Sequence, residues 1–295
     1  MHLPRAAVLA LSGPAYRVAL NDRWRIGTQR RLAEASTRLN RTPKGTLVQH
    51  VRLGDRPAER TTLGPTDRPR AVLYLHGGGY RLGTPRMYRP LAAHLSRAAD
   101  AVVFNLDYRM APEDPYPAAL HDAVAAFEKL IATGGHFTPT QVAIAGDSAG
   151  GGLAVAAARV LTDRGTPPAA LALLSPWTDP SDTDMPERDF VINQRWGRTN
   201  AASYRGAANP TDTGYAPMHG PLDGLPPMLI HYATNEMLAA QIQRFAARAS
   251  AAGADVQLVA QPRLWHSAHI LAGMLRDATD ATAAVGAFLR AHLHD

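Results

Sequence analysis

Hydrophobic and polar positions along the chain follow two periods that alternate from residue 70 onward. Short apolar runs bounded by Gly, Pro or Asp predict buried strands at residues 71–76, 101–106, 141–146, 169–174, 227–232 and 255–261. Longer stretches with apolar residues at helical spacing predict helices at residues 86–99, 118–131, 149–162, 238–252 and 278–293. Because strands and helices alternate, we expect a largely parallel sheet with helices on both of its faces.

The remaining segments do not follow this alternation. Residues 47–53 and 57–63 predict an antiparallel hairpin at an edge of the sheet. Residues 1–45 are Arg-rich and helical in tendency, whereas residues 180–222 are rich in Pro, Asp, Asn and Gly and show no clear core period. Since no linker or internal repeat interrupts the pattern, we expect one domain over residues 1–295, with an added N-terminal segment and one insertion.

The composition is that of a globular protein. The 295 residues are 46% hydrophobic, which excludes a disordered or fibrous chain and suffices for one large core. No apolar run approaches the roughly 18 residues that a membrane span needs. The run at residues 6–11 is also shorter than the apolar stretch of a secretory signal, at least ~7 residues. The absence of Cys excludes disulfides, thiolate metal sites and a cysteine nucleophile. We therefore expect a cytoplasmic protein with no membrane partner.

The net charge of +6 invites a comparison with nucleic-acid-binding proteins. Such proteins gather their basic residues on one face and interleave them with stacking aromatics. Here the 31 basic residues, nearly all Arg, are scattered along the chain, and only 6% of the residues are aromatic. A diffuse basic surface of this kind predicts no nucleic-acid partner.

A G-x-S-x-G motif at residues 146–150 lies between a predicted strand and a predicted helix. Its glycines permit a strained turn that lifts the Ser148 hydroxyl clear of the backbone, with a helix N-terminus behind it. Gly151 and Gly152 follow directly. In this context the motif makes Ser148 the candidate nucleophile, in preference to a glycine turn that serves only tight packing.

A second cluster, three glycines starting at Gly77, follows His76 and the first predicted strand of the alternating region. Glycines let backbone N–H groups approach an oxygen closely, as an oxyanion hole requires. We expect Gly77 and Gly78 to supply two donors and Ala149 the third, while His76 holds the loop. The cluster matches neither G-x-G-x-x-G nor G-x-x-x-x-G-K-[ST], so a phosphate loop is not indicated.

Five motifs occur in order along the chain: Y-L-H-G-G-G-Y at 74–80, D-Y-R-M-A-P-E at 107–113, G-D-S-A-G-G-G at 146–152, L-S-P-W-T-D at 174–179 and G-L-P-P at 224–227. In this set and order, from about residue 45 to its end, the chain resembles the hormone-sensitive-lipase family of α/β-hydrolases. The resemblance implies the α/β-hydrolase fold, with a twisted, mostly parallel sheet, helices on both faces and a helical N-terminal cap over an acyl pocket. It also implies hydrolysis of carboxylic esters by a Ser–Asp–His triad, with no cofactor and a small ester or other carbonyl compound as partner.

The triad histidine of that family lies in a loop after the last strand, in a pattern similar to M-x-H-x-x-H. The corresponding residues here read L-W-H-S-A-H at 264–269. The resemblance thus makes His266 the general base that takes the proton of Ser148. His269, three residues later, is expected in packing or in the pocket. Because the pair lacks a third ligand and an H-E-x-x-H context, we expect no metal site.

The chain departs from the family at the triad acid, which the family carries in a pattern similar to G-x-D-E-x-L. Aligned without gaps from Gly224, the chain reads A-T-N-E-M-L at 233–238, so that Asn235 stands in place of the acid. An amide carries no charge and can favour the wrong histidine tautomer; in a serine protease the same Asp→Asn change lowers kcat about 10⁴-fold. We therefore expect weak hydrolysis, with Ser148, Asn235 and His266 in the chain order of the fold's triad.

Three functions stay open at this point. In the first, another carboxylate replaces the missing one in an ordinary serine hydrolase of small to medium esters or lactones. Glu236 is adjacent but needs the loop to turn it inward, and Asp179 and Asp255 start on other strands. In the second, His266 and the oxyanion hole catalyse a non-hydrolytic step such as dehydration, elimination or cyclisation. In the third, the pocket only binds a ligand, although the presence of both Ser148 and His266 argues against pure binding.

The substrate pocket has several candidate residues, of which Tyr80 has the clearest position because it follows the oxyanion glycines directly. Residues 181–203 should lie near the acyl pocket if they follow the family. The favoured interpretation of that segment is a solvated surface loop. The alternative is a pocket for a larger polar substrate, in which Arg195 or Arg198 would meet a substrate carboxylate. The sequence leaves a homodimer open. The other pocket candidates are Asp147, Trp196 and His269, with Tyr16 and Trp24 from the N-terminal segment.

Overall fold

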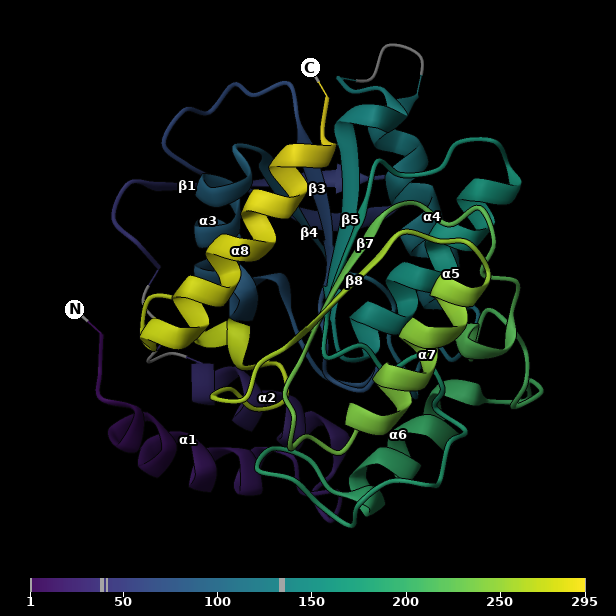
Figure 1. Cartoon of the computed structure of the whole chain (residues 1–295). Helices are drawn as coiled ribbons and strands as arrows, with labels where there is room; N and C mark the ends of the chain where they lie inside the picture. The colour runs from purple at the N-terminus through teal and green to yellow at the C-terminus, as the bar shows by residue number, and fades with distance from the viewer. Residues whose placement is uncertain (1, 38–39, 41, 133–135, 295) are drawn as a thin grey trace.

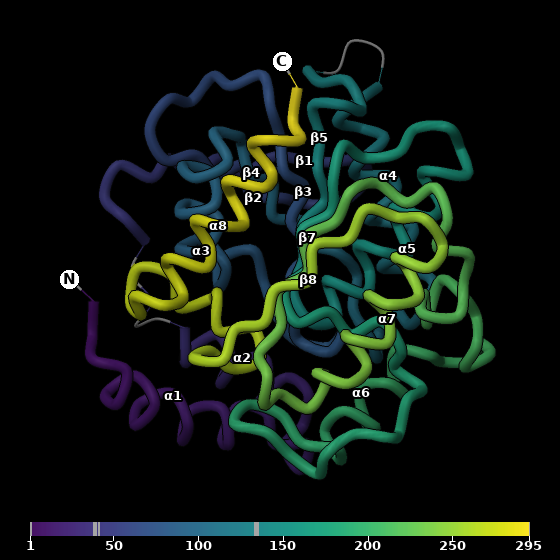
Figure 2. Tube along the Cα trace, in the orientation of Figure 1, coloured from purple at the N-terminus to yellow at the C-terminus, as the bar shows by residue number. Residues whose placement is uncertain are grey.

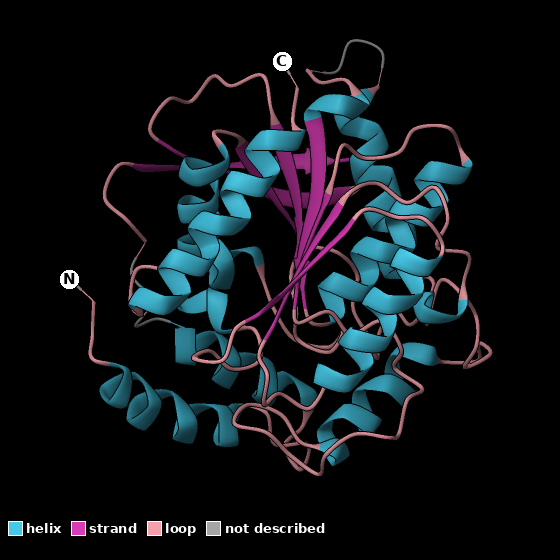
Figure 3. Cartoon of the chain, in the orientation of Figure 1, coloured by secondary structure: helices cyan, strands magenta, loops and turns pink. Residues whose placement is uncertain are grey.

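A computed structural model of the chain describes residues 2–37, 40, 42–132 and 136–294. Within them, one sheet of eight strands forms the centre of the molecule (Figure 3). Its order across the sheet is β1-β2-β4-β3-β5-β6-β7-β8. The strands are β1 (Thr46–Leu53), β2 (Arg56–Leu63), β3 (Ala71–Leu75), β4 (Val102–Leu106), β5 (Val142–Asp147), β6 (Leu171–Leu174), β7 (Met228–Tyr232) and β8 (Val256–Ala260).

The strands from β3 to β8 run parallel, whereas β1 and β2 form an antiparallel hairpin that joins the sheet at β4. This arrangement confirms the predicted parallel sheet and its edge hairpin. Every residue of β3, β4 and β5 is buried, as is typical of parallel strands that helices cover on both faces. At the opposite edge from the hairpin, β8 leaves most of its residues exposed.

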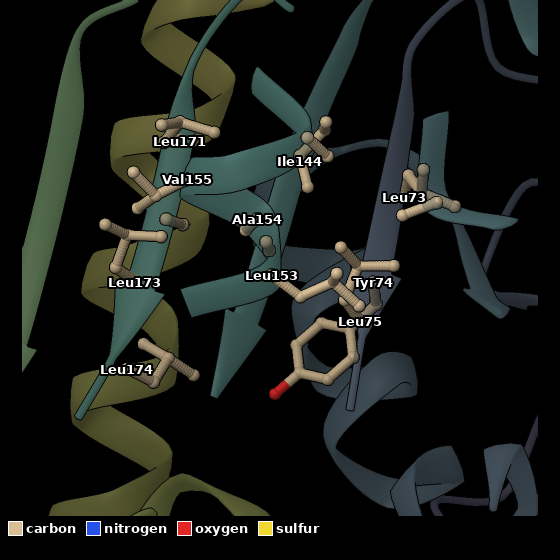
Figure 4. Close-up of a cluster of buried hydrophobic side chains, with 14 of the residues drawn as sticks. Leu73, Tyr74, Leu75, Ile144, Leu153, Ala154, Val155, Leu171, Leu173 and Leu174 are labelled. Atoms are coloured by element: carbon tan, nitrogen blue, oxygen red, sulfur yellow. The ribbon is translucent and has the colours of Figure 1, made fainter. Parts of the chain in front are cut away.

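Helices cover the two faces of the sheet (Figure 1). α3 (Pro85–Ala99) and α8 (Arg276–His292) lie on one face, and α4 (Ala118–Ile131), α5 (Ala149–Asp163) and α7 (Ala239–Ala251) lie on the other. Leu73, Ile144 and Leu171 of the strands gather with Leu153 and Val155 of α5 in the buried core (Figure 4). Complete burial of a side chain of this size contributes about 1.5–3 kcal/mol, so this core fixes α5 and the residue that precedes it.

Two helices of the Arg-rich N-terminal segment, α1 (Arg5–Ala19) and α2 (Ile26–Ser36), lie at the end of the molecule where the parallel strands finish (Figures 1 and 2). We call α1, α2 and the turn between them the cap. The Arg30 guanidinium fastens α2 to the body. It donates to the Glu113 carboxylate at 2.7 and 2.8 Å and to the carbonyl oxygen of Arg81 at 2.9 Å. Open α/β sheets bind their ligands beyond the carboxyl ends of their strands, and the cap covers that edge.

The insertion at 180–222 contains a helix, α6 (Gln194–Arg205), that the sequence pattern did not predict. Asn193 begins it by accepting a hydrogen bond from the Trp196 N–H at 3.0 Å. The buried residues of α6 include Asn200 between Trp196 and Tyr204, so a polar residue interrupts the apolar spacing that would have marked the helix. Among the described residues, no helix has both the length and the apolar character that crossing a membrane requires.

Candidate active site

Ser148 lies between the last residue of β5 and the first residue of α5, with φ 51° and ψ −119°. A residue other than glycine rarely adopts this backbone conformation. Here the close approach of neighbouring backbone segments of the same chain enforces it. A Cβ on Gly146 would lie 2.4 Å from the carbonyl oxygen of Gly150, and a Cβ on Gly150 would lie 2.0 Å from that of Leu75. The two glycines of the motif are therefore a steric requirement of this turn.

A row of hydrogen bonds runs from Ser148 through His266 to Glu236. The Ser148 Oγ is 2.9 Å from the His266 Nε2, and the His266 Nδ1 is 3.1 Å from the Glu236 Oε2. Because the carboxylate accepts, the proton of His266 sits on Nδ1 and leaves Nε2 free to accept from the serine hydroxyl. All three side chains are buried. Their geometry is that of a nucleophile, a general base and the acid that orients the base.

The electrostatics of His266 follow from this row. Burial by itself lowers the pKa of His266, but the hydrogen bond and the negative charge of Glu236 oppose burial, and Asp189 and Asp147 add to them. The net effect raises the pKa of His266 above its ordinary value. The carboxylate thus stabilises the imidazolium that forms when the serine loses its proton.

Asn235 does not occupy the acid position, and the expectation from the ungapped alignment is wrong. Its side chain is exposed, whereas Glu236 is buried against His266. The chain turns here because the Glu236 N–H bonds to the Ala233 carbonyl at 3.3 Å. The residue after Glu236, Met237, is buried, so the chain runs inward at this point. The acid is therefore one residue later than the alignment placed it.

The other two carboxylates considered for the acid position serve elsewhere. Asp179 accepts hydrogen bonds from Ser181 and pairs with His219, its Oδ2 lying 3.0 Å from the His219 Nε2. Asp255 is exposed just before β8. Neither carboxylate bonds to His266, so Glu236 alone orients it among the described residues.

The oxyanion donors differ in part from the expected set. The Gly77 N–H already donates to the Asp147 Oδ1 at 2.8 Å, so Gly77 does not supply a free donor. Within the described chain, the N–H groups of Gly78 and Ala149 have no hydrogen-bond partner. Gly78 has φ 113°, and a Cβ there would lie 2.2 Å from the Leu82 carbonyl oxygen. The geometry leaves Gly78 and Ala149 as candidate donors to an oxygen beside Ser148.

Asp147 holds the oxyanion loop from beneath. Besides the Gly77 N–H, it accepts from the Tyr74 hydroxyl at 3.1 Å and from the Tyr88 hydroxyl at 3.3 Å. Burial raises the pKa of Asp147, while the hydrogen bonds from Gly77 and Tyr74 act in the opposite direction. This carboxylate connects the strand that carries the nucleophile to the glycine loop that faces it.

A cavity of about 730 Å³ opens above Ser148 and His266. The cap contributes much of its wall, which is mainly apolar, and α6 and the loop after His266 close the other side. The sequence had offered Tyr16 alone among the cap residues that line it. Those residues are Val8, Leu11, Ser12, Ala15, Tyr16, Ala19, Leu20, Ala33, Ala35 and Ser36, and Leu3 and Thr37 line the cavity just outside the cap.

Two of the four predicted pocket residues, Asp147 and Trp196, line the cavity, and the other two do not. Tyr80 is buried and stacks on Tyr204, with ring centroids 3.5 Å apart. His269 packs instead on His231, its Nε2 lying 3.1 Å from the His231 Nδ1. Burial lowers the pKa of His269 to about 3, so this side chain is a neutral part of the core.

The arginines proposed to meet a substrate carboxylate are also outside the cavity. Arg195 donates to Asp22 of the cap at 2.6 Å, and Arg198 donates to Gln194 at 2.8 Å. Trp24 is 48% exposed and does not line the cavity either. Hence no Arg is found among the described lining residues, and the cavity does not select for a carboxylate in that way.

Asp189 lies in the insertion near the site, and no motif in the sequence marks it out from the other polar residues of that segment. Its Oδ2 accepts the Met237 N–H at 2.9 Å, and its Oδ1 accepts the N–H groups of Val191 and Ile192 at 2.7 Å each. Val191 and Ile192 line the cavity. Asp189 therefore joins the loop that carries Glu236 to one wall of the pocket.

Comparison with known proteins gives a consistent result. A family model described as alpha/beta hydrolase fold matches residues 72–270. The chain is 41% identical to an acetyl-hydrolase of Streptomyces hygroscopicus over 75% of each chain. It is 32% identical to the carboxylesterase NlhH of Mycobacterium tuberculosis over 76% of this chain and 74% of that protein. The solved structure of an esterase from the bacterial hormone-sensitive lipase family superposes with a TM-score of 0.91 at 33% identity, and the match covers 100% of both chains.

Proposed function

The chain belongs to the alpha/beta hydrolase fold family and is an enzyme of the carboxylesterase type, and we propose that it hydrolyses small to medium carboxylic esters through Ser148, His266 and Glu236. One observation carries the proposal: the hydrogen-bonded row in which a buried carboxylate orients the base of a serine at the floor of a cavity. The acetyl-hydrolase and carboxylesterase relatives support the same reaction.

The reaction proceeds in two halves. The Ser148 Oγ attacks the ester carbonyl while the His266 Nε2 takes its proton, and the N–H groups of Gly78 and Ala149 receive the developing oxyanion. His266 then gives the proton to the leaving alcohol, which departs and leaves an acyl group on Ser148. Water repeats the sequence on the acyl-enzyme and releases the acid. Glu236 accepts the hydrogen bond of the His266 Nδ1–H throughout and stabilises the imidazolium.

The expectation of weak hydrolysis rested on an amide at the acid position. With Glu236 in that position the reason for weakness disappears, and we propose an esterase of ordinary efficiency. The non-hydrolytic and ligand-binding alternatives also drew their support from Asn235, and they lose it for the same reason.

The substrate class follows from the cavity wall. Its apolar lining and its volume of about 730 Å³ suit an aliphatic acyl chain, or a leaving alcohol of similar size, better than a charged group. Trp196 and Ile192 lie on the insertion side and Val8 and Leu11 on the cap side, so the chain would extend between the two segments.

The test compares two adjacent substitutions, Glu236→Gln and Asn235→Asp, in the hydrolysis of p-nitrophenyl butyrate. Glu236→Gln should lower kcat by about 10²–10⁴-fold, because the amide neither fixes the tautomer nor stabilises the imidazolium. Asn235→Asp is the matched control and should change kcat by less than about two-fold, since its side chain is exposed. A large gain in Asn235→Asp, with little loss in Glu236→Gln, would overturn the assignment of the acid.

A second measurement addresses the nucleophile. Incubation with an activated ester should add the acyl mass to the intact protein, and Ser148→Ala should abolish both this adduct and turnover. Unchanged turnover in Ser148→Ala would exclude the mechanism, whichever residue serves as the acid.

A further inference from the structure

The solvent side of α1 is apolar, which is unusual for the outer side of a cap helix. Leu11 and Val18 are seven residues apart and are 56% and 49% exposed. Pro14, between them, is also exposed, and positions three or four apart share a helix face. We call these three residues the outer α1 face. Figures 1 and 2 show α1 along the border of the molecule.

Three exposed arginines lie toward the C-terminal end of α1 or in the turn after it. Arg17 lies on α1 itself, and Arg23 and Arg25 lie in the turn that follows; in the part of the chain that the structure describes, none of the three is in an ion pair. The acidic residues of the cap are already paired, Asp22 with Arg195 at 2.6 Å and Glu34 with Arg86 at 3.6 Å. The surface therefore combines an apolar helix face with three cations that have no acidic partner in the described chain, and we call these three arginines its rim.

The outer α1 face also borders the active-site cavity. Leu11 is the link, because it is more than half exposed and yet lines the cavity above Ser148. Whatever covers this face thus lies at the mouth through which an ester would reach the site.

We propose that the outer α1 face, with its rim of Arg17, Arg23 and Arg25, docks on an anionic lipid surface. An interfacial helix buries its apolar side at the boundary between headgroups and acyl chains, and its cations attract anionic headgroups. A second copy of the chain fits less well, since it would bring the same unpaired arginines together. Such docking departs from the expectation, drawn from the sequence, that the protein has no membrane partner.

The proposal deepens the proposed function, because docking would present the cavity mouth to esters held in the lipid. Binding itself does not depend on turnover. It can therefore be measured on the Ser148→Ala protein, so that a failure to bind and a failure to hydrolyse are separate results.

Trp24 provides the reporter for this measurement. It lies in the turn after α1 and is 48% exposed, whereas Trp177, Trp196 and Trp265 are 5%, 4% and 4% exposed. With phosphatidylglycerol vesicles, we expect the tryptophan fluorescence to shift to the blue and the protein to sediment with the lipid. Pure phosphatidylcholine vesicles should give neither effect, and high salt should reverse both. The same fluorescence shift should be absent from Trp24→Phe.

Paired variants assign the surface. Leu11→Asn with Val18→Asn should weaken binding at least about tenfold, and so should Arg17→Gln with Arg23→Gln and Arg25→Gln. The control is Leu258→Asn with Val259→Asn, two residues of β8 that are 39% and 37% exposed, and it should bind as the parent does. Equal binding to both kinds of vesicle, no binding, or undiminished binding by the α1 variants would overturn the proposal. A self-association of the protein that the α1 variants abolish would assign the face to a second copy instead.

Discussion

At the scale of single residues, Ser148 shows how a strained backbone is held in place. Its φ of 51° is of the kind that costs about 1–3 kcal/mol. The surrounding hydrogen bonds oppose that cost: the Ser148 N–H donates to Leu174 at 2.9 Å, and its carbonyl oxygen accepts from Gly151, Gly152 and Trp177 at 2.8–3.1 Å. These backbone hydrogen bonds position the nucleophile independently of the contacts of its side chain.

The glycines beside Ser148 give the first prediction. Gly150→Ala places a Cβ 2.0 Å from the Leu75 carbonyl oxygen, which cannot move without disturbing β3. We expect a loss of about 3 kcal/mol in the free energy of unfolding, and a loss of activity, because the turn must open. Gly197→Ala in α6 is the control. Nothing lies within 4 Å of a Cβ at that position, and alanine should stabilise the helix by up to about 1 kcal/mol. Thermal unfolding of the two variants measures these changes, and equal midpoint temperatures for Gly150→Ala and Gly197→Ala would contradict the steric argument.

A second prediction concerns pH. His266 must be neutral to accept the serine proton, so kcat/KM falls as the pH drops through its pKa. Because Glu236 raises the pKa of His266 above 6.5, the acidic limb of the profile should lie above that value. In Glu236→Gln the hydrogen bond and charge that raise the pKa of His266 are weakened, and burial then lowers that pKa. The acidic limb of the kcat/KM profile should therefore move to lower pH, and the maximal kcat/KM should fall. A limb that stays in place would mean that another group controls this ionisation.

At the scale of elements, the alternating pattern predicted the strands and helices of the body well, because buried strands and amphipathic helices differ in period. The helix in the insertion was harder to predict, since α6 buries Asn200 and so lacks a continuous apolar stripe. The triad acid was missed by one residue for a similar reason. The loop at 233–238 has no period, and only the turn at Ala233 and the burial of Met237 decide that Glu236 faces inward.

The contact between the insertion and this loop gives a third prediction. Asp189→Ala removes the acceptor of the Met237 N–H and a negative charge that raises the pKa of His266. We expect about a tenfold loss of kcat and a shift of the acidic limb to lower pH. Asp189→Asn can still accept the hydrogen bond, so it should restore most of kcat but not the position of the limb. Asp184→Ala, at an exposed position of the same insertion, should change neither. A purely structural role for Asp189 would lower kcat without moving the limb.

At the scale of the whole molecule, the cap forms much of the cavity wall, and polar contacts join it to the body beside its few buried apolar residues, Val8, Ala19 and Ala33. Arg30 bonds to Glu113, to the Arg81 carbonyl and, at 3.1 Å, to the Ala111 carbonyl. The Asp22–Arg195 pair joins the cap to α6. Contacts of this kind hold a segment in position while leaving it free to open locally.

A fourth prediction tests whether the position of the cap decides acyl-chain length. Arg30→Ala should loosen α2 and raise KM for long-chain p-nitrophenyl esters about tenfold, with a smaller effect on the acetate, because only a long chain reaches the cap wall. The neighbouring Arg31→Ala is the control, since Arg31 is exposed and, among the residues that the structure describes, its guanidinium bonds only to the Gly27 carbonyl of its own helix. An equal rise in KM for short and long esters would refute a role in chain length.

The fastening of α1 has a consequence for the order in which the protein folds during synthesis. The Leu3 N–H bonds to the Met274 carbonyl at 2.9 Å, and the Arg5 guanidinium bonds to the Arg263 carbonyl, 258 residues further along the chain. A segment that leaves the ribosome early must therefore wait for one that leaves late, and contacts between such distant residues form slowly. His266 lies within the late segment. We therefore expect His266 and α1 to reach their places beside Ser148 late in synthesis, and a nascent chain that ends before His266 to hydrolyse no ester.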